Sequence, residues 1–147
     1  MSDAPLYERD FYAWANEQGR LLRSGQLSEA DIENIAEEIE TLARGEKREF
    51  RRLLRRLLLR LLRWQVQPVR RSKARKVGIK LQRRALARHL SESPSLVELL
   101  AEVTEDAYTS AFLKAQVKTG LGESAFPATC PWSFEQVMAA DFWPDGD

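Results

Sequence analysis

FRRLLRRLLLRLLRW, at residues 50–64, is the stretch that decides the fold. Residues 53–62 within it are seven leucines and three arginines and nothing else. At the roughly 100° per residue of an α-helix, six leucines fall on one half of the helix surface and the arginines on the other. A strand would mix Leu and Arg on both faces. The pattern therefore predicts an amphipathic helix whose leucines, each contributing about 1.5–3 kcal/mol when fully buried, form the main core.

Leu59 is the one leucine that falls among the arginines. An apolar residue on the charged half, together with more leucine surface than one small bundle covers, indicates contact with another molecule. We therefore expect the protein to self-associate as a symmetric dimer, the commonest form of homo-oligomer, with Leu59 as the candidate contact.

Length and composition are those of an ordinary globular protein. The chain has 147 residues, 44% of them hydrophobic, which fits one domain spanning residues 1–147. Its first residues lack the basic and apolar regions of a secretory signal, and arginines interrupt the leucine stretch too often for a transmembrane helix. The single cysteine, Cys130, excludes an internal disulfide. These features predict a cytoplasmic location without a membrane association.

Helical periodicity divides the chain into four main helices, and no strand pattern is present. The first is predicted over residues 6–24, ended by Gly25, and the second over residues 29–66, ended by Gln67 and Pro68. The third spans residues 72–90, and the fourth begins at Ser95 and ends before Gly120. This predicts an all-α fold, an irregular four-helix bundle. A straight second helix would span roughly 55 Å, against a radius of gyration of about 15 Å for a domain of this size, so we expect a bend or break at Arg44 and Gly45.

Capping patterns locate three helix starts. Ser28 with Asp31, Ser95 with Glu98, and Ser133 with Gln136 each place an acceptor side chain three residues before an acid or amide. The third pair predicts a short helix ending near residue 140, inside a tail at residues 123–147. The tail is too apolar for a disordered segment and is expected to pack on the bundle; its aromatic residues are Phe126, Trp132, Phe134, Phe142 and Trp143.

Charge is distributed unevenly along the chain. Residues 44–88 hold 18 basic and 2 acidic residues, a net charge of +16, whereas the rest of the chain carries −15. Clustered cations neutralise phosphates, so one hypothesis is a nucleic-acid-binding regulator that uses the basic segment at residues 70–88. Its candidate contact residues are Arg70, Arg71, Lys73, Arg75 and Lys76. The favoured alternative is that acids at residues 29–40 and 98–106 neutralise this segment within the fold.

The sequence offers little for metal binding. Glu33, Glu37 and Glu40 lie on one face of the second predicted helix, and Asp10 could face them. Di-metal bundles pair such residues with a Glu-x-x-His spacing, which the only histidine, His89, does not complete. We interpret the acids as a solvated or ion-paired face and predict no metal ligand.

Nucleophilic catalysis is supported no better. Cys130 lies between Thr129 and Pro131 in an apolar context, whereas a reactive thiol needs a nearby cation or helix N-terminus. His89 has no evident catalytic partner, and no glycine-rich phosphate loop is present. The sequence therefore predicts no catalytic residue and no cofactor, and it leans away from an enzyme.

Several motifs together resemble one family. They are YERDFYAW at 7–14, DIENIAEEI at 31–39, LLRWQVQP at 61–68, RRS at 70–72, QR at 82–83, SPSL at 93–96, FP at 126–127, CPW at 130–132 and DFWP at 141–144. In this order they resemble the bacterial family described as domain of unknown function twenty-nine. The resemblance implies an all-helical bacterial protein without an established activity. Arg60 stands where that family often has histidine, and Arg75 where it often has an aromatic residue, so a site built on those two positions is altered here.

The functional prediction is a non-enzymatic interaction or assembly module of the bacterial cytosol. It is expected to act as a homodimer, with a protein partner possible. Nucleic-acid binding through the basic segment is the alternative.

Overall fold

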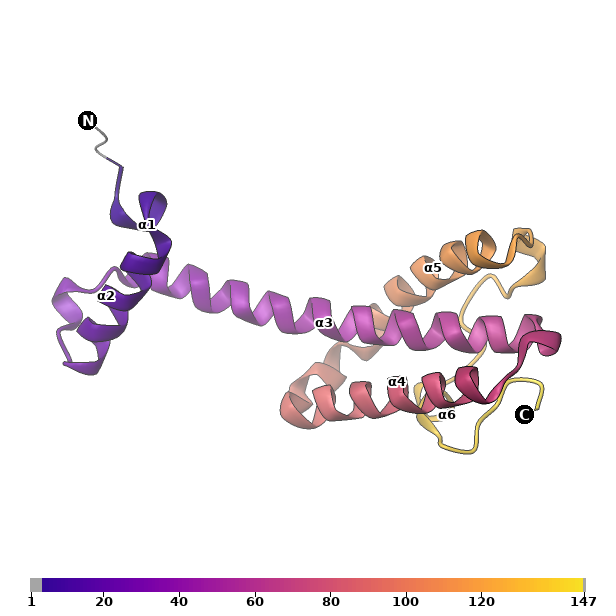
Figure 1. Cartoon of the computed structure of the whole chain (residues 1–147). Coiled ribbons are helices and arrows are strands. Elements are labelled where there is room, and N and C mark those ends of the chain that lie inside the picture. The colour runs from indigo at the N-terminus through magenta and orange to yellow at the C-terminus, as the bar shows by residue number, and fades with distance from the viewer. Residues whose placement is uncertain (1–3, 147) are drawn as a thin grey trace. The chain divides into compact units, whose positions relative to one another are not determined.

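The computed structural model describes residues 4–146 (Figure 1). The regular elements of these residues are all helices, with no strand among them. This confirms the predicted all-α fold. The α-helices are α1 (Leu6–Arg9), α2 (Phe11–Arg23), α3 (Ile32–Val66), α4 (Lys73–Glu92), α5 (Leu100–Thr119) and α6 (Phe134–Met138). Short 3-10 turns occur at Leu27–Glu29, Pro68–Arg70, Pro94–Leu99 and Glu123–Ala125.

The fold divides into two compact units, Met1–Gly45 (unit 1) and Glu46–Asp147 (unit 2). Helix α3 contributes to both units and is helical at every residue from Ile32 to Val66. The helix therefore has no break at Arg44 and Gly45, whereas a bend there stays a prediction. Gly45 costs about 1 kcal/mol relative to alanine in a helix interior, but the good helix formers on either side of it keep the helix continuous.

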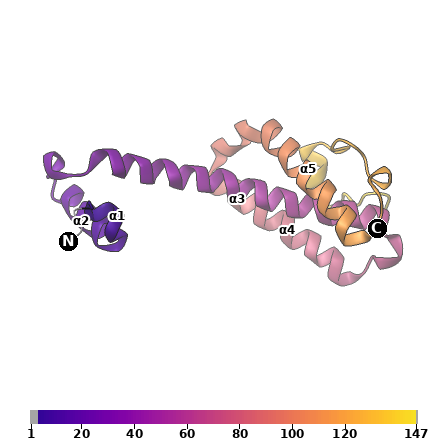
Figure 2. The same cartoon turned by 90° about the horizontal axis from the view of Figure 1, so that it is seen from above.

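Unit 2 is built on the leucine stretch. The side chains of α3 that are buried are Phe50, Leu53, Leu54, Leu57, Leu58, Leu61, Leu62 and Trp64. They form one core cluster with Ile79 and Leu86 of α4 and with Val103, Ala107 and Ala111 of α5. Helices α3, α4 and α5 lie side by side in both views (Figures 1 and 2). The prediction that the leucine half forms the main core is confirmed.

Leu59 does not stand apart from this core. It is half-buried and packs against the core cluster, so the structure accounts for it without a second molecule. Its role in self-association stays a prediction.

The C-terminal segment packs on unit 2, as predicted. Phe126 and Val137 are buried, and the partly buried Trp132, Phe142 and Trp143 pack against the same core. The capping box of α6 is also confirmed, since the Ser133 hydroxyl accepts from the backbone N–H of Gln136 at 3.1 Å and the Gln136 side chain accepts from the backbone N–H of Ser133 at 2.9 Å. The short helix ends at Met138, slightly earlier than predicted.

Unit 1 has a much smaller interior. Of its apolar side chains, Trp14 and Leu21 of α2 are buried. The indole Nε1–H of Trp14 donates to the Asp31 carboxylate at 3.0 Å, and the Tyr7 hydroxyl donates to Glu38. The first predicted helix is two helices, because the Asp10 carboxylate accepts from the backbone N–H of Ala13 at 3.1 Å and thereby starts α2 anew.

Two predicted helix starts are wrong. Ser28 lies in the turn Leu27–Glu29, and α3 begins after Asp31, whose carboxylate accepts from Trp14 and from Asn34. Ser95 lies in the turn Pro94–Leu99, and α5 begins without a side-chain cap. In contrast, Ser72 caps α4, with its hydroxyl accepting from the backbone N–H of Arg75 at 3.2 Å.

Candidate functional site

The predicted basic contact residues lie in different surroundings. Arg71 is turned toward the end of the chain: its Nε–H donates to the Trp64 carbonyl at 2.8 Å, and its other nitrogens donate to the carbonyls of Pro144 and Asp145, each at 3.3 Å. Its guanidinium lies 5.3 Å from the Trp64 ring centre. Arg71 therefore holds the C-terminal segment against the end of α3, which the sequence did not indicate.

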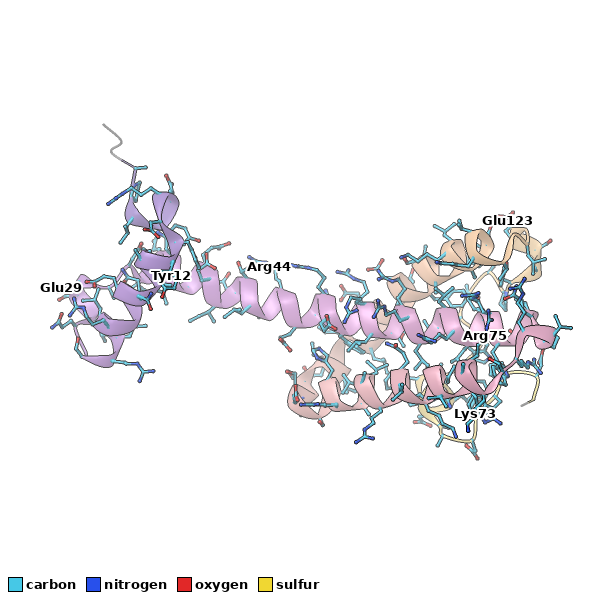
Figure 3. All side chains as sticks on the ribbon, viewed as in Figure 1. Tyr12, Glu29, Arg44, Lys73, Arg75 and Glu123 are labelled. Carbon is cyan, nitrogen blue, oxygen red and sulfur yellow. The ribbon has the colours of Figure 1, made fainter. Side chains whose placement is uncertain are left out.

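The other members of the predicted set differ in exposure. Arg70 and Lys73 are exposed, whereas Arg75 and Lys76 are half-buried. The Lys76 ammonium lies 5.0 Å from the Trp143 ring centre. Figure 3 labels Arg75 over the ribbon of α3 and Lys73 below that of α4. Two members thus face solvent, two contact the C-terminal segment, and Arg75 faces α3.

Arg83 is a further structural cation inside the same segment. It is 6% exposed, and it donates through Nε to the Val137 carbonyl at 2.8 Å and through Nη2 to the Phe142 carbonyl at 2.6 Å. Burial lowers the pKa of its guanidinium. This arginine is part of the core and is not available to a partner.

The acids of α5 pair with α3 rather than with the basic segment. The carboxylate of Glu102 lies 2.5 Å from Lys47 Nζ, and that of Asp106 lies 2.7 Å from Arg51 Nη1. These two acids therefore pair with cations of the +16 segment that precede residue 70, and neutralisation of residues 70–88 stays a prediction. The reason is geometric: helices α3 and α5 are neighbours in the core, so their charged edges meet first.

Three arginines converge on a small hollow in unit 2 that sequence reasoning missed. Arg60 and Arg63 of α3 and Arg75 of α4 line it, over a floor of Trp64 and Ile79. The basic segment points to Arg75, and the family resemblance links Arg60 with it, but nothing in the sequence indicates that Arg63 lines the same hollow.

Unit 1 presents an unusual apolar surface. Its exposed large hydrophobic side chains are Phe11, Tyr12, Leu22, Leu27, Ile32, Ile39 and Leu42. Figure 3 labels Tyr12 in this unit. Among the described residues of this unit, seven large apolar side chains are exposed and two are buried, the reverse of what a self-sufficient core shows. Where such residues join into one patch, they mark an interaction surface.

The residues considered for chemistry lie in unreactive surroundings. Burial raises the pKa of the Cys130 thiol, whose sulfur lies 3.4 Å from the Trp132 carbonyl, so the thiolate is disfavoured. Nε2 of His89 lies 3.1 Å from the Glu46 carbonyl. Glu33, Glu37 and Glu40 are exposed, and in residues 4–146 no group of three or more His, Cys, Asp or Glu side chains is arranged to hold a metal ion.

The protein is thus all-helical and has two notable surface features: the arginine hollow of unit 2 and the exposed apolar face of unit 1. Within the described residues, no helix has the length and apolar character needed to cross a membrane. The chain belongs to the family described as "Domain of unknown function DUF29", whose match covers residues 6–143. Comparison with curated proteins and with solved structures gives no significant match.

Proposed function

We propose that the protein is a non-enzymatic assembly module whose unit 1 pairs with unit 1 of a second copy. The observation that carries the proposal is the apolar face of unit 1. Leu42 and Ile39 are 71% and 61% exposed, whereas the buried apolar side chains of this unit are Trp14 and Leu21. Burying apolar area releases about 25 cal/mol per Å², so a surface of this kind gains from being covered.

The spacing of these residues favours another helix of the same kind as the cover. Ile32, Ile35, Ile39 and Leu42 follow one another at intervals of three, four and three. This is the spacing of the seam along which paired helices interlock. A seam that repeats in this way is complementary to itself, as a two-fold symmetric dimer requires.

Charge and side-chain size around the seam fit the same pairing. Ala36 and Ala43 lie beside it on the helix surface, and small side chains permit close approach of a second backbone. Glu33, Glu37 and Glu40 lie on the opposite side of α3, by helical geometry. Pairing along the seam therefore brings apolar and small residues together without placing these carboxylates against their copies.

Sedimentation equilibrium at micromolar protein tests the proposal. We expect the wild type to have twice the chain mass and the double variant Ile39→Glu, Leu42→Glu to be a monomer with unchanged helix content, because both side chains are exposed in the single chain. Val117→Glu is the matched control, since Val117 is 84% exposed on α5 of unit 2. A monomeric wild type, or a double variant that remains dimeric, contradicts the proposal.

The cytoplasm is the compartment we propose for this module. One cysteine in 147 residues suits a reducing compartment, where small domains do not depend on disulfides.

Nucleic-acid binding remains a second candidate, favoured by one observation. Arg70 and Lys73 are exposed, and the α5 acids Glu102 and Asp106 pair with α3 instead of with them. If these cations contact phosphates, log affinity for duplex DNA should fall against log salt with a slope of about −0.9 per phosphate. Arg70→Ala with Lys73→Ala should reduce that slope in a folded protein, and an unchanged slope contradicts this candidate.

A further inference from the structure

We infer that the hollow between α3 and α4 is a binding site for a tetrahedral oxyanion, the terminal phosphate group of a small molecule, held by Arg60, Arg63 and Arg75. This site lies in unit 2, and it is independent of the self-association proposed for unit 1.

The three cations are not balanced by acids. No ion pair within residues 4–146 joins Arg60, Arg63 or Arg75 to a carboxylate, although the chain forms such pairs elsewhere along α3. Desolvation lowers the pKa of Arg75, and the charges of Arg63, Arg70 and Arg60 lower it further. Gathering like charges is unfavourable unless an anion is shared among them. A bound oxyanion is the partner that this arrangement lacks.

Arg63 supplies a second sign of a missing partner. Its Nε atom is buried and makes no hydrogen bond in the structure. Buried donors are nearly always satisfied, because leaving one unpaired costs about 1–3 kcal/mol. Arginine presents its donors as a planar fork that matches the oxygens of a phosphate or carboxylate, so an oxyanion in the hollow satisfies both charge and hydrogen bonding.

Gly78 fits Arg60 to the hollow. A methyl group at this position would overlap Nη1 of Arg60 and would lie 3.2 Å from its Cζ, so the guanidinium rests directly on the glycine of α4. Glycine inside a helix is about 1 kcal/mol less favourable than alanine. The three atoms nearest to this position all belong to the Arg60 guanidinium, so Gly78 serves the placement of Arg60 against α4.

The size of the hollow selects the ligand. It holds about 60 Å³, with Trp64 and Ile79 as apolar walls. One water needs roughly 10–15 Å³ of such space, so there is room for only a few atoms. A terminal phosphate group fits this space and brings two negative charges to three cations. A nucleic-acid backbone needs an open groove along which successive phosphates lie.

Calorimetric titration of the full chain with inorganic phosphate, at fixed ionic strength, tests the site. We expect saturable binding by the wild type, at least a tenfold loss of affinity in Arg63→Gln and in Arg75→Gln, and no loss in Arg48→Gln, which removes an exposed arginine of α3 outside the hollow. Thermal unfolding should agree: phosphate should raise the midpoint of the wild type more than that of the two hollow variants. General stabilisation by phosphate would raise all of them equally.

The variant Gly78→Ala distinguishes an effect on phosphate binding from an effect on folding stability. Alanine favours the helix, so the unliganded protein should unfold at the same or a higher temperature, while the displaced Arg60 should weaken phosphate binding several-fold. Three results overturn the inference: no saturable binding by the wild type, equal binding by the hollow variants and the wild type, or unchanged binding by a folded Gly78→Ala protein. Tighter binding of a short DNA duplex than of phosphate, lost in Arg63→Gln, would reassign the hollow to a nucleic-acid backbone.

Discussion

Arg83 shows how a cation can serve as a core residue. Its two carbonyl acceptors, on Val137 and Phe142, belong to the C-terminal segment, and its guanidinium lies 5.3 Å from the Trp143 ring centre. These three interactions replace part of the water around a buried charge, and Nη1 of Arg83 is buried without a hydrogen bond. The arginine therefore joins α4 to a segment that has few regular backbone hydrogen bonds of its own.

We predict that Arg83→Met destabilises the protein although it keeps most of the apolar stem. Each carbonyl left without its donor costs about 1–3 kcal/mol, offset in part by removal of the buried charge. A net loss of at least about 1 kcal/mol should appear in urea unfolding. Arg84→Met, which changes the exposed neighbouring arginine, should be nearly neutral. Equal effects of the two substitutions would refute the structural role of Arg83.

Asp31 gives unit 1 a predictable response to acid. Hydrogen bonds from Asn34 and then from Trp14 lower the pKa of its carboxyl group. A lowered pKa in the folded state means that Asp31 stabilises unit 1 above its unfolded value of about 3.9, and that this contribution is lost as the pH falls through the lower, folded-state value. The Trp14 indole N–H resonance should therefore shift below about pH 4. In Asp31→Asn, which keeps an acceptor but cannot titrate, this shift should be absent.

At the scale of elements, sequence patterns predicted helix ends and buried residues where these depend on the surface of a single helix. The end of α3 at Val66 and the burial of Leu54, Leu57 and Leu58 follow from periodicity and from Pro68 alone. The Ser28 cap failed because Asp31, its expected companion, is bonded to Trp14 and Asn34, a contact that local pattern cannot reveal. Tertiary contacts of this kind override weak capping signals.

The arginine hollow and the contacts of Arg71 were less predictable, because they too depend on tertiary contacts. Charge runs identified Arg75, but its neighbours Arg60 and Arg63 come from another helix, and the tail carbonyls that hold Arg71 come from a third segment. The apolar residues Ile32, Ile39 and Leu42 are exposed in the single chain. Periodicity shows that a helix has an apolar side and does not show what covers it.

Trp64 is the residue through which α3 anchors the tail, so its truncation tests that element contact. It is buried, its Nε1–H donates to the Gly146 carbonyl at 2.8 Å, and its ring centre lies 5.1 Å from that of Trp143. Trp64→Ala should cost about 3–5 kcal/mol of unfolding free energy, the usual range for a core tryptophan. Trp64→Phe should cost less, because it keeps a ring and loses the donor. A midpoint unchanged within error in Trp64→Ala would show that this contact contributes nothing.

At the scale of the whole molecule, two units of unequal interior share one helix. Unit 2 surrounds the leucine half of α3, whereas unit 1 buries Trp14 and Leu21. Segments below about 40 residues seldom bury enough surface to be stable alone, and unit 1 is close to this limit. The length of the chain predicted one domain. Whether the two units form one cooperative domain is decided by whether they unfold in a single transition.

We predict that unit 1 unfolds before unit 2 and that only its transition depends on protein concentration. Its own core is small, so most of its stability comes from the proposed pairing, which mass action strengthens as concentration rises. Hydrogen exchange followed through a denaturant series, at two protein concentrations about a hundredfold apart, should show amides of α2 exchanging earlier than those of α5. The α2 transition should move to higher denaturant at the higher concentration, while the α5 transition should stay in place.

In the double variant Ile39→Glu, Leu42→Glu, the concentration dependence of the α2 transition should vanish. Coincident transitions for α2 and α5 at both concentrations would instead identify one cooperative domain, as the chain length predicted, and would remove the argument that unit 1 depends on a second copy.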